Sequence, residues 1–341
     1  MKVLVLNESD DSALGASYAR AFQFLGHDVA LWDPVAKLEK LSLWRFAPTR
    51  RILERQLICR SNRKWIEDLL AIPADFIWAG KGAWATPWLW LEIKRRKPQV
   101  KLICYNADNP IVSYSRGGNR PWVTKSIPCF DIYCTYNRSL VKPLQAAGAK
   151  KVLWIPFAWD HWLHPELEIT DEARRAYASD ILFIGNADRH RERWIGDIIE
   201  AAEPYGWTFR IYGNWKGSRD RRVLNFVQGI KLHGKEMVKA VRAAKISINI
   251  LRLQNENSHN MRTFEIPGCN GVMISQFSPE QNEFFENGKA AVYFRTPQEA
   301  VDKLARVLSR NSLLSKLRKC AHEVASQNTY VHRARTLLEY L

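Results

Sequence analysis

The sequence predicts an α/β protein with two doubly wound domains in tandem, each built on a parallel sheet. Short apolar runs recur along both halves of the chain and are separated by helical stretches. Polar and glycine-containing segments follow several of these runs, as expected where parallel strands end. With 341 residues, of which 46% are hydrophobic and 25% charged, the chain is long enough for two cores and too balanced in composition to be disordered.

The first half opens with a βαβ pattern. Residues 2–6 form an apolar run, 13–25 have a helical pattern, and 27–32 form a second apolar run that ends at Asp33. The first turn, NESDDSALG, lacks the GxGxxG glycines that let a backbone approach a pyrophosphate, so a redox cofactor is not expected. The further strands expected in this half lie at 76–78, 101–105, 132–135 and 151–155.

A second βα series follows a polar stretch that contains prolines. We expect a first domain at 1–165, a linker at 166–179, a second domain at 180–325, and a C-terminal helix at 326–341 that packs back on the first domain. Two doubly wound domains bind ligands beyond the carboxyl ends of their strands, so a central cleft is the expected site. The strands expected in the second domain lie at 180–184, 208–212, 230–232, 246–250, 272–275 and 291–294.

Residues 257–276, NSHNMRTFEIPGCNGVMISQ, combine a charged pair with a buried strand. Arg262 and Glu265 lie three positions apart, so a helix places a guanidinium suited to phosphate and a carboxylate suited to ribose hydroxyls on one face. The alternative is an ordinary surface ion pair at the start of a helix. The polar residues that precede this pair are too dense for a core and are expected to face the cleft: Asn255, Asn257, His259 and Asn260.

Two strand ends in the second domain carry small and polar residues. Those after the first strand suit a phosphate or, alternatively, form a generic strand-to-helix turn. After the second strand, Gly213 permits close backbone approach and Trp215 is placed to cover a base or a sugar, unless the segment is a simple turn with a half-buried Trp. The residues concerned are Gly185, Asn186, Arg189, Gly213, Asn214 and Trp215.

Polar residues also follow strand ends in the first domain. A carboxylate such as Asp108 at this edge can act as a general base toward a substrate hydroxyl, or it can cap a turn before Pro110. The residues after the first strand bind substrate hydroxyls or, equally well, cap the following helix. The set consists of Asp10, Asp11, Ser12, Lys81, Asp108 and Asn109.

The net charge of +16 is spread unevenly and indicates an anionic partner or surface. Residues 1–165 carry 24 Lys and Arg against 14 Asp and Glu, and 11 of the 14 Trp. Residues 37–64 hold nine basic and two acidic side chains between large apolar ones, which suits an anionic membrane surface. A solvated basic helix packed on its own domain is the alternative. Nucleic acid is not expected, because no recognition motif accompanies the charge.

Several protein classes are excluded by what the sequence lacks. No apolar run approaches the roughly 20 residues that a spanning helix needs, and the N-terminus becomes polar too early for a secretory signal. The six cysteines show neither a CxxC pair nor His partners at metal spacing, so we expect reduced, buried thiols and no metal site. We therefore expect a cytoplasmic protein, attached peripherally to the inner face of the membrane if residues 37–64 bind lipid.

Six segments of residues 180–341 follow one another as in a known family. They read FIGNADRHRERW, IYGNW, HGKEMVKAVRAAKISINI, RTFEIPGCNGVMIS, FFENGKAAVYF and NTYVHRARTLLEYL. In this order they resemble the CgeB-like glycosyltransferases, named after a spore maturation protein, whose C-terminal domain is like the glycosyl transferases group 1. The first half matches more loosely, through FIWAGKG, YNADNP and FDIYCTYNRSLVKPLQAAGAKKVLWIPFAWD.

The resemblance implies a GT-B fold, in which two Rossmann-like domains face a central cleft, and a hexosyltransferase-type activity without a cofactor. The second domain would bind a nucleotide sugar, UDP- or GDP-linked, and the first an acceptor, which is a glycan, a lipid-linked glycan or a protein. Glu265 matches the glutamate that binds the donor ribose. Arg262 would neutralise the departing diphosphate in place of a metal, and His259 is a further catalytic candidate.

The sequence departs from the EX7E pattern of retaining enzymes. The position eight before Glu265 is Asn257, and the nearest acid is Glu256, so the stereochemistry stays open. A noncatalytic module that binds a nucleotide or a glycan is one alternative to a transferase. A basic nucleic-acid-binding protein is the other.

Overall fold

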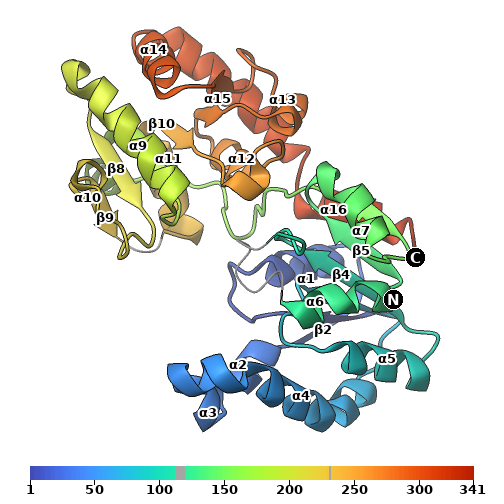
Figure 1. Ribbon diagram of the computed structural model, residues 1–341. Coiled ribbons are helices and arrows are strands. Elements are labelled where there is room, and N and C mark those ends of the chain that lie inside the picture. The colour runs from blue at the N-terminus through green and yellow to red at the C-terminus, as the bar shows by residue number, and fades with distance from the viewer. Residues whose placement is uncertain (113–119, 230–231) are drawn as a thin grey trace. The chain divides into compact units, whose positions relative to one another are not determined.

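The computed structural model describes residues 1–112, 120–229 and 232–341, which form two compact units (Figure 1). The first unit comprises Met1–Pro156 together with Tyr330–Leu341, and the second comprises Phe157–Thr329. Residues 157–165, expected in the first domain, thus belong to the second unit. Each unit is built on a six-stranded parallel sheet, which confirms the predicted α/β fold class.

The first sheet has the strand order β2-β1-β3-β4-β5-β6. Its strands are β1 (Lys2–Leu6), β2 (Asp28–Trp32), β3 (Phe76–Gly80), β4 (Lys101–Asn106), β5 (Ile132–Thr135) and β6 (Val152–Trp154). Its helices are α1 (Leu14–Phe24), α2 (Pro34–Glu39), α3 (Ser42–Arg45), α4 (Ala47–Ala71), α5 (Pro87–Arg96), α6 (Pro121–Ser126), α7 (Val141–Ala146) and α16 (Tyr330–Leu338).

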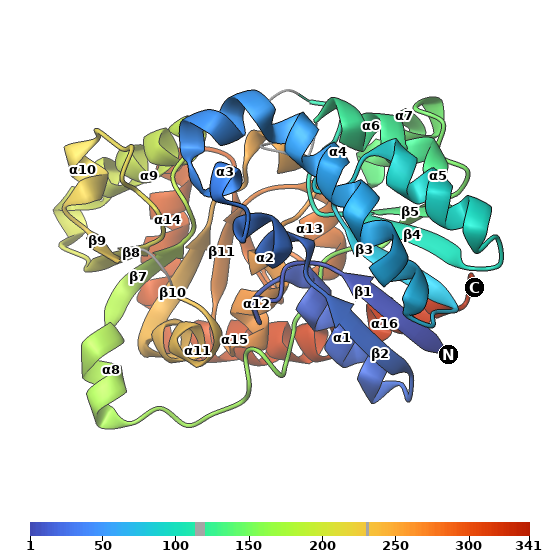
Figure 2. The ribbon, with the colours of Figure 1, turned by 90° about the horizontal axis from the view of Figure 1, so that it is seen from below.

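Both faces of the first sheet are covered, which explains why most positions of its strands are apolar and buried. Leu4 and Leu6 join a core with Trp65 of α4, whose ring meets Trp32 edge to face at 5.1 Å. On the opposite face, Tyr18 of α1 packs on Trp78 of β3. Tyr330 meets the same Tyr18 at 5.4 Å, so the C-terminal helix α16 lies against α1. Figure 2 shows α2 and α3 leading into the long helix α4.

The second sheet has the strand order β12-β11-β10-β7-β8-β9. Its strands are β7 (Ser179–Ile184), β8 (Phe209–Tyr212), β9 (Val227–Gly229), β10 (Ala244–Asn249), β11 (Met273–Gln276) and β12 (Val292–Phe294). Its helices are α8 (Asp171–Tyr177), α9 (Arg189–Ala202), α10 (Arg221–Leu224), α11 (Gly234–Ala243), α12 (Arg262–Gly268), α13 (Pro279–Phe284), α14 (Pro297–Leu308) and α15 (Asn311–Ser326).

Two segments of the second unit differ from the expected pattern. The strand expected at 230–232 falls partly outside the described residues, because 230 and 231 are not described, and the strand in this region ends at Gly229. The expected linker at 166–179 contains helix α8, which packs against α11. No helix in the described ranges is both long and apolar enough to cross a membrane.

The segment that begins the second unit is held against α12. A side chain on Gly268 would place its Cβ 2.4 Å from Cδ1 of Trp159, so only glycine leaves room for this ring. His322 of α15 packs edge to face on the same Trp159 and lies 3.1 Å from the carbonyl oxygen of Pro267 through Nδ1. Helix α12, which carries Arg262 and Glu265, is therefore wedged between two packed segments.

Candidate functional site

Arg262 and Glu265 form an ion pair on the first turn of α12. The Nε atom of Arg262 donates to the carbonyl oxygen of Ile184, the last residue of β7, at 3.2 Å. The carboxylate is almost completely buried, since Glu265 is 4% exposed. A buried ion pair is costly to desolvate and contributes little net stability. The pair is thus not the surface pair of the alternative interpretation, and it lies where a parallel sheet binds ligands.

The loops after β7 and β8 touch one another through glycines. Gly213 has φ +146°, and a Cβ there would lie 2.0 Å from the carbonyl oxygen of Gly185. Asn186 accepts a hydrogen bond from the backbone N–H of Asn214 through Oδ1 at 2.9 Å. These four residues, which the sequence predicts as ligand contacts, form one double loop at the end of the strands. Both asparagines are exposed there.

Arg191 is a buried residue beside this site that the sequence did not predict. Its Nε donates to the carbonyl oxygen of Ile250 at 3.0 Å and its Nη1 to that of Asn186 at 3.3 Å. Burial, together with the positive charges of Arg252 and Arg262, lowers the pKa of Arg191 to about 10, although Asp188 opposes the shift. The described residues thus gather three guanidiniums near the ends of β7 and β10, a charge distribution suited to an anion.

Capping explains why Arg191, and not the predicted Arg189, points inward. Asp188 is the N-cap of α9 and accepts from the backbone N–H of Arg191 at 2.9 Å. Arg189 occupies the first helical position and is exposed. An aspartate followed three residues later by an arginine is the sequence signal that would have identified the buried guanidinium.

His164 lies in the electrostatic field of the Arg262–Glu265 pair. Its side chain is buried, and among the described residues its Nδ1 has no hydrogen-bond partner. Burial lowers its pKa; Glu265 opposes this effect and Arg262 adds to it. The imidazole is therefore neutral near pH 7. It was not predicted, because a histidine in a proline-containing stretch gives no signal of what surrounds it.

The polar residues ahead of α12 are mostly buried, which corrects the expectation that they face a cleft. Asn260 donates to Asn249 of β10 through Nδ2 at 2.9 Å, and Asn249 donates back at 3.3 Å. Gln281 of α13 accepts from the hydroxyl of Thr263 at 2.9 Å. Asn255 is also buried, whereas Asn257 is exposed. This network fixes the start of α12 to the sheet.

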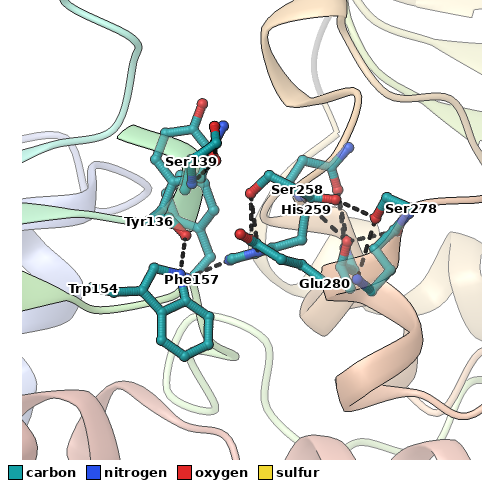
Figure 3. A network of polar contacts seen from close by, with 12 residues as sticks. Tyr136, Ser139, Trp154, Phe157, Ser258, His259, Ser278 and Glu280 are labelled. Atoms are coloured by element: carbon teal, nitrogen blue, oxygen red, sulfur yellow. Dashed lines mark hydrogen bonds and ion pairs between the residues drawn. The ribbon is translucent and has the colours of Figure 1, made fainter. Parts of the chain in front are cut away.

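His259 is fully buried, at 0% exposure. Its ring connects the segment of Phe157 with that of Glu280 (Figure 3). Its Nε2 accepts from the backbone N–H of Phe157 at 3.0 Å, so its proton lies on Nδ1, which is 2.9 Å from Oε2 of Glu280. The hydroxyl of Ser258 donates to the same oxygen at 2.6 Å. Three phenylalanine rings surround the imidazole edge to face. With both nitrogens occupied, His259 supports the site instead of contacting a substrate, which corrects the expected catalytic role.

Trp215 is a core residue. Its indole is buried and packs on Phe183 of β7, with ring centroids 6.0 Å apart. The ring therefore offers no open face to a base or a sugar, in contrast to the expectation. The loop that precedes it keeps its position at the site through Gly213.

In the first unit, the structure brings Lys81 and Asp108 together as an ion pair. Lys81 follows β3 and has φ +57°, and its backbone N–H donates to the carbonyl oxygen of Tyr105 at 2.9 Å. Asp108 follows β4, the neighbouring strand, and its N–H is bound by Oδ1 of Asn106 at 3.0 Å. Asn109 is buried and closes a turn by accepting from the N–H of Ile111 at 2.9 Å.

The loop after β1 is organised by Asp10 and by a residue that was not predicted, Asn7. Asp10 accepts from the N–H of Ser12 at 2.8 Å, while the side chain of Asp11 is exposed. Asn7 is wedged between two glycines, because a Cβ on Gly15 would lie 2.3 Å from its Cβ and a Cβ on Gly80 would lie 2.0 Å from its Oδ1. The signal in the sequence that could have identified Asn7 is its position directly after a buried strand.

Within residues 1–112, 120–229 and 232–341, no group of three or more His, Cys, Asp or Glu lies close enough together to hold a metal ion. All six cysteines are free thiols, and four of them are buried.

Comparison with known proteins gives a partial family match and a shared fold. Residues 189–339 match the family model described as glycosyl transferase-like, whereas no curated protein matches the chain. Anabaena HepE in complex with UDP is 13% identical, with 100% of this chain and 99% of that chain covered and a TM-score of 0.63. Sucrose-phosphate synthase from Thermosynechococcus elongatus is 13% identical over 100% and 98%, with a TM-score of 0.70. A glycosyltransferase from Rickettsia africae is 10% identical over 99% and 97%, with a TM-score of 0.68. The protein thus has the GT-B fold, with two Rossmann-like domains, and carries a glycosyl transferase-like region over residues 189–339.

Proposed function

We propose that the protein is a glycosyltransferase of the CgeB-like type that binds a nucleotide-activated sugar through its second unit. The match of residues 189–339 to a glycosyl transferase-like family supports this function. So does the fold, which is shared with a protein solved with UDP and with UDP-glucose. The observation that carries the proposal is the ion pair of the partly exposed Arg262 with the buried Glu265 at the carboxyl end of β7.

The proposed roles follow from the chemistry of the side chains. Glu265 accepts hydrogen bonds from the ribose hydroxyls of the donor. Arg262 and Arg191 stabilise the negative charge that develops on the diphosphate as its bond to the anomeric carbon breaks, so that transfer needs no metal. In the first unit, Asp108 takes the proton of the acceptor hydroxyl as the new glycosidic bond forms, and Lys81 orients this carboxylate.

Nucleotide binding tests the donor site. UDP and GDP are titrated against the parent protein and the variant Arg262→Ala, and the thermal midpoint is measured. A ligand at a hundred times its dissociation constant stabilises the folded state by about 2.7 kcal/mol, so the parent midpoint should rise with at least one of them. The variant Arg193→Ala, which removes an exposed arginine of α9, should respond like the parent.

Two outcomes would count against the donor site. One is a parent protein that responds to neither nucleotide, and the other is an Arg262→Ala variant that responds as strongly as the parent. Hydrolysis or transfer of a nucleotide sugar, measured in the same preparations, separates an enzyme from a noncatalytic nucleotide-binding module, which would bind without turnover.

We also propose that α3 and the first half of α4 contact an anionic membrane surface. None of residues 42–56 is buried, and the buried face of α4 begins only at Leu57. Large apolar side chains are exposed on this segment: Leu43 at 49%, Phe46 at 63% and Ile52 at 76%. The four-residue helix α3 and the first turns of α4 have no buried face, and a basic helix with exposed apolar residues gains one at the headgroup boundary.

The charge of this segment has the sign that anionic lipid requires. Arg51 and Arg55 are exposed and, among the described residues, have no carboxylate within ion-pairing distance. The acidic Glu54 is already paired with Arg120 at 2.9 Å. The double variant Arg51→Gln/Arg55→Gln should therefore cosediment less with vesicles that contain anionic lipid, by about fivefold for each arginine.

The apolar contribution is tested separately. Phe46→Ser/Ile52→Ser should lower binding to anionic and neutral vesicles alike, whereas Leu91→Ser, which changes an exposed leucine on α5, should leave it unchanged. Equal binding of the parent protein to anionic and neutral vesicles would contradict the role of charge. Binding to RNA in preference to vesicles would contradict the membrane as the partner.

A further inference from the structure

A cavity of about 300 Å³ opens in the second unit, away from the Arg262–Glu265 pair. Arg242 lies near the end of α11, directly before β10, and Asn270 lies shortly before β11, so the cavity is at the amino ends of these strands. The Arg262–Glu265 pair lies toward the carboxyl end of the same parallel sheet, where Arg262 contacts Ile184, and helix α12 runs between it and Asn270. The residues that line the cavity are Glu168, Ile169, Arg174, Arg242, Asn270 and Arg318.

Three guanidiniums and one carboxylate converge on this cavity. Within the described part of the chain, none of the three arginines lies within 4.0 Å of a carboxylate oxygen, so Glu168 does not neutralise them. Arg242 donates one hydrogen bond, from Nη1 to the carbonyl oxygen of Leu167 at 2.7 Å. The Nε of Arg318 is shielded from solvent and has no hydrogen-bond partner among the described residues.

The positive charges of Arg242 and Arg318 also repel one another. Burial lowers the pKa of Arg318, and the positive charge of Arg242 lowers it further. A solvated basic surface would spread such charges apart and leave every N–H in water. Here a donor is withdrawn from water without an acceptor, which is costly, and a bound anion would remove both the repulsion and the unpaired donor.

We propose that this cavity binds a small phosphate-bearing anion, either inorganic phosphate or a phosphomonoester. Guanidinium groups recognise phosphate oxygens through pairs of parallel N–H donors, and three such groups around one cavity suit a dianion. The volume is at the lower end of the range for small-molecule sites, so the ligand is compact. Such a ligand would connect α8, α11 and α15, and its binding does not depend on the proposed transferase activity.

The test is a titration with inorganic phosphate at constant ionic strength, with chloride as the balancing anion. The dissociation constant is measured by calorimetry, and the thermal midpoint is followed in parallel. The variants Arg242→Gln and Arg318→Gln should each bind phosphate about tenfold or more weakly. Lys319→Gln, which removes an exposed cation on the same helix, should bind like the parent, as should Arg262→Gln at the other edge of the sheet.

Stability without ligand gives a second readout. In chloride alone, Arg318→Gln should be at least as stable as the parent, because the substitution removes a half-buried guanidinium whose Nε has no hydrogen-bond partner among the described residues. A hexose phosphate that binds more tightly than inorganic phosphate would identify a phosphomonoester as the ligand, and the reverse order would identify free phosphate. The proposal fails if phosphate does not bind the parent, if chloride competes equally, or if both arginine variants bind as tightly as the parent.

Discussion

The substitution Glu265→Gln is expected to weaken donor binding by about two orders of magnitude. A carboxylate accepts hydrogen bonds from two ribose hydroxyls, and a hydrogen bond to a charged group contributes about 1.5–3 kcal/mol. Glutamine keeps the size of the side chain but has no charge and only one accepting oxygen. The expected loss of about 2–3 kcal/mol corresponds to a factor of roughly 30–150 in the dissociation constant, which calorimetry with UDP or GDP measures directly.

The control separates binding from stability. Glu286→Gln removes an exposed glutamate that is paired with Lys289 at 3.1 Å, and it should change neither donor affinity nor turnover. Urea unfolding of both variants shows how much of any effect comes from the loss of the Arg262 ion pair. If Glu265→Gln were less stable than the parent but bound the donor equally well, Glu265 would be a structural partner of Arg262 and the proposed ribose contact would be wrong.

The substitution His259→Ala is expected to lower the free energy of unfolding by about 3–5 kcal/mol. The change empties a space enclosed by three phenylalanine rings. It also removes the acceptor of the Phe157 N–H and one of the donors to the Glu280 carboxylate. The N–H and the carboxylate themselves stay buried. Chemical denaturation measures the loss. Because His259→Ala is severely destabilised, Ser258→Ala serves as a milder second variant. Its expected loss is about 1–2 kcal/mol, from the hydrogen bond to Glu280.

Activity per folded molecule distinguishes the supporting role from a catalytic one. Under conditions where both proteins are folded, the milder variant should keep the turnover of the parent. His161→Ala removes a half-buried histidine that lies four residues after Phe157, and it should leave stability nearly unchanged. A His259→Ala protein as stable as the parent but without turnover would show that His259 acts in the reaction.

The sheets could be predicted from the sequence because their strands are buried on both faces. A strand such as 132–135 is buried at every position and mostly apolar, so its location needs no knowledge of its neighbours. The positions of Lys81 and Asp108 at strand ends were likewise predictable, since both follow such strands. Their pairing depends on the order β3-β4 in the sheet, which places the two strand ends side by side.

The partners of polar residues could not be read from the sequence. From the sequence, Asn260 resembles a cleft residue, because nothing indicates that Asn249, from a strand, lies beside it. Gln281, from a later helix, joins the same network. The same holds for His259, whose acceptor role toward Phe157 joins residues 102 positions apart. Arg191 was missed for a local reason, because the exact start of α9 decides which arginine turns inward.

The return of the last twelve residues to the first unit has a consequence for biosynthesis. Tyr330 covers Tyr18, which in turn packs on Trp78 and Tyr105, so this aromatic cluster is completed by the final helix of the chain. On the ribosome, the 173 residues of Phe157–Thr329 are made before that helix, which takes roughly 10–35 s at usual elongation rates. The nascent first unit therefore waits with an open aromatic surface while the second unit is synthesised, and the unit begun first is the last to be finished.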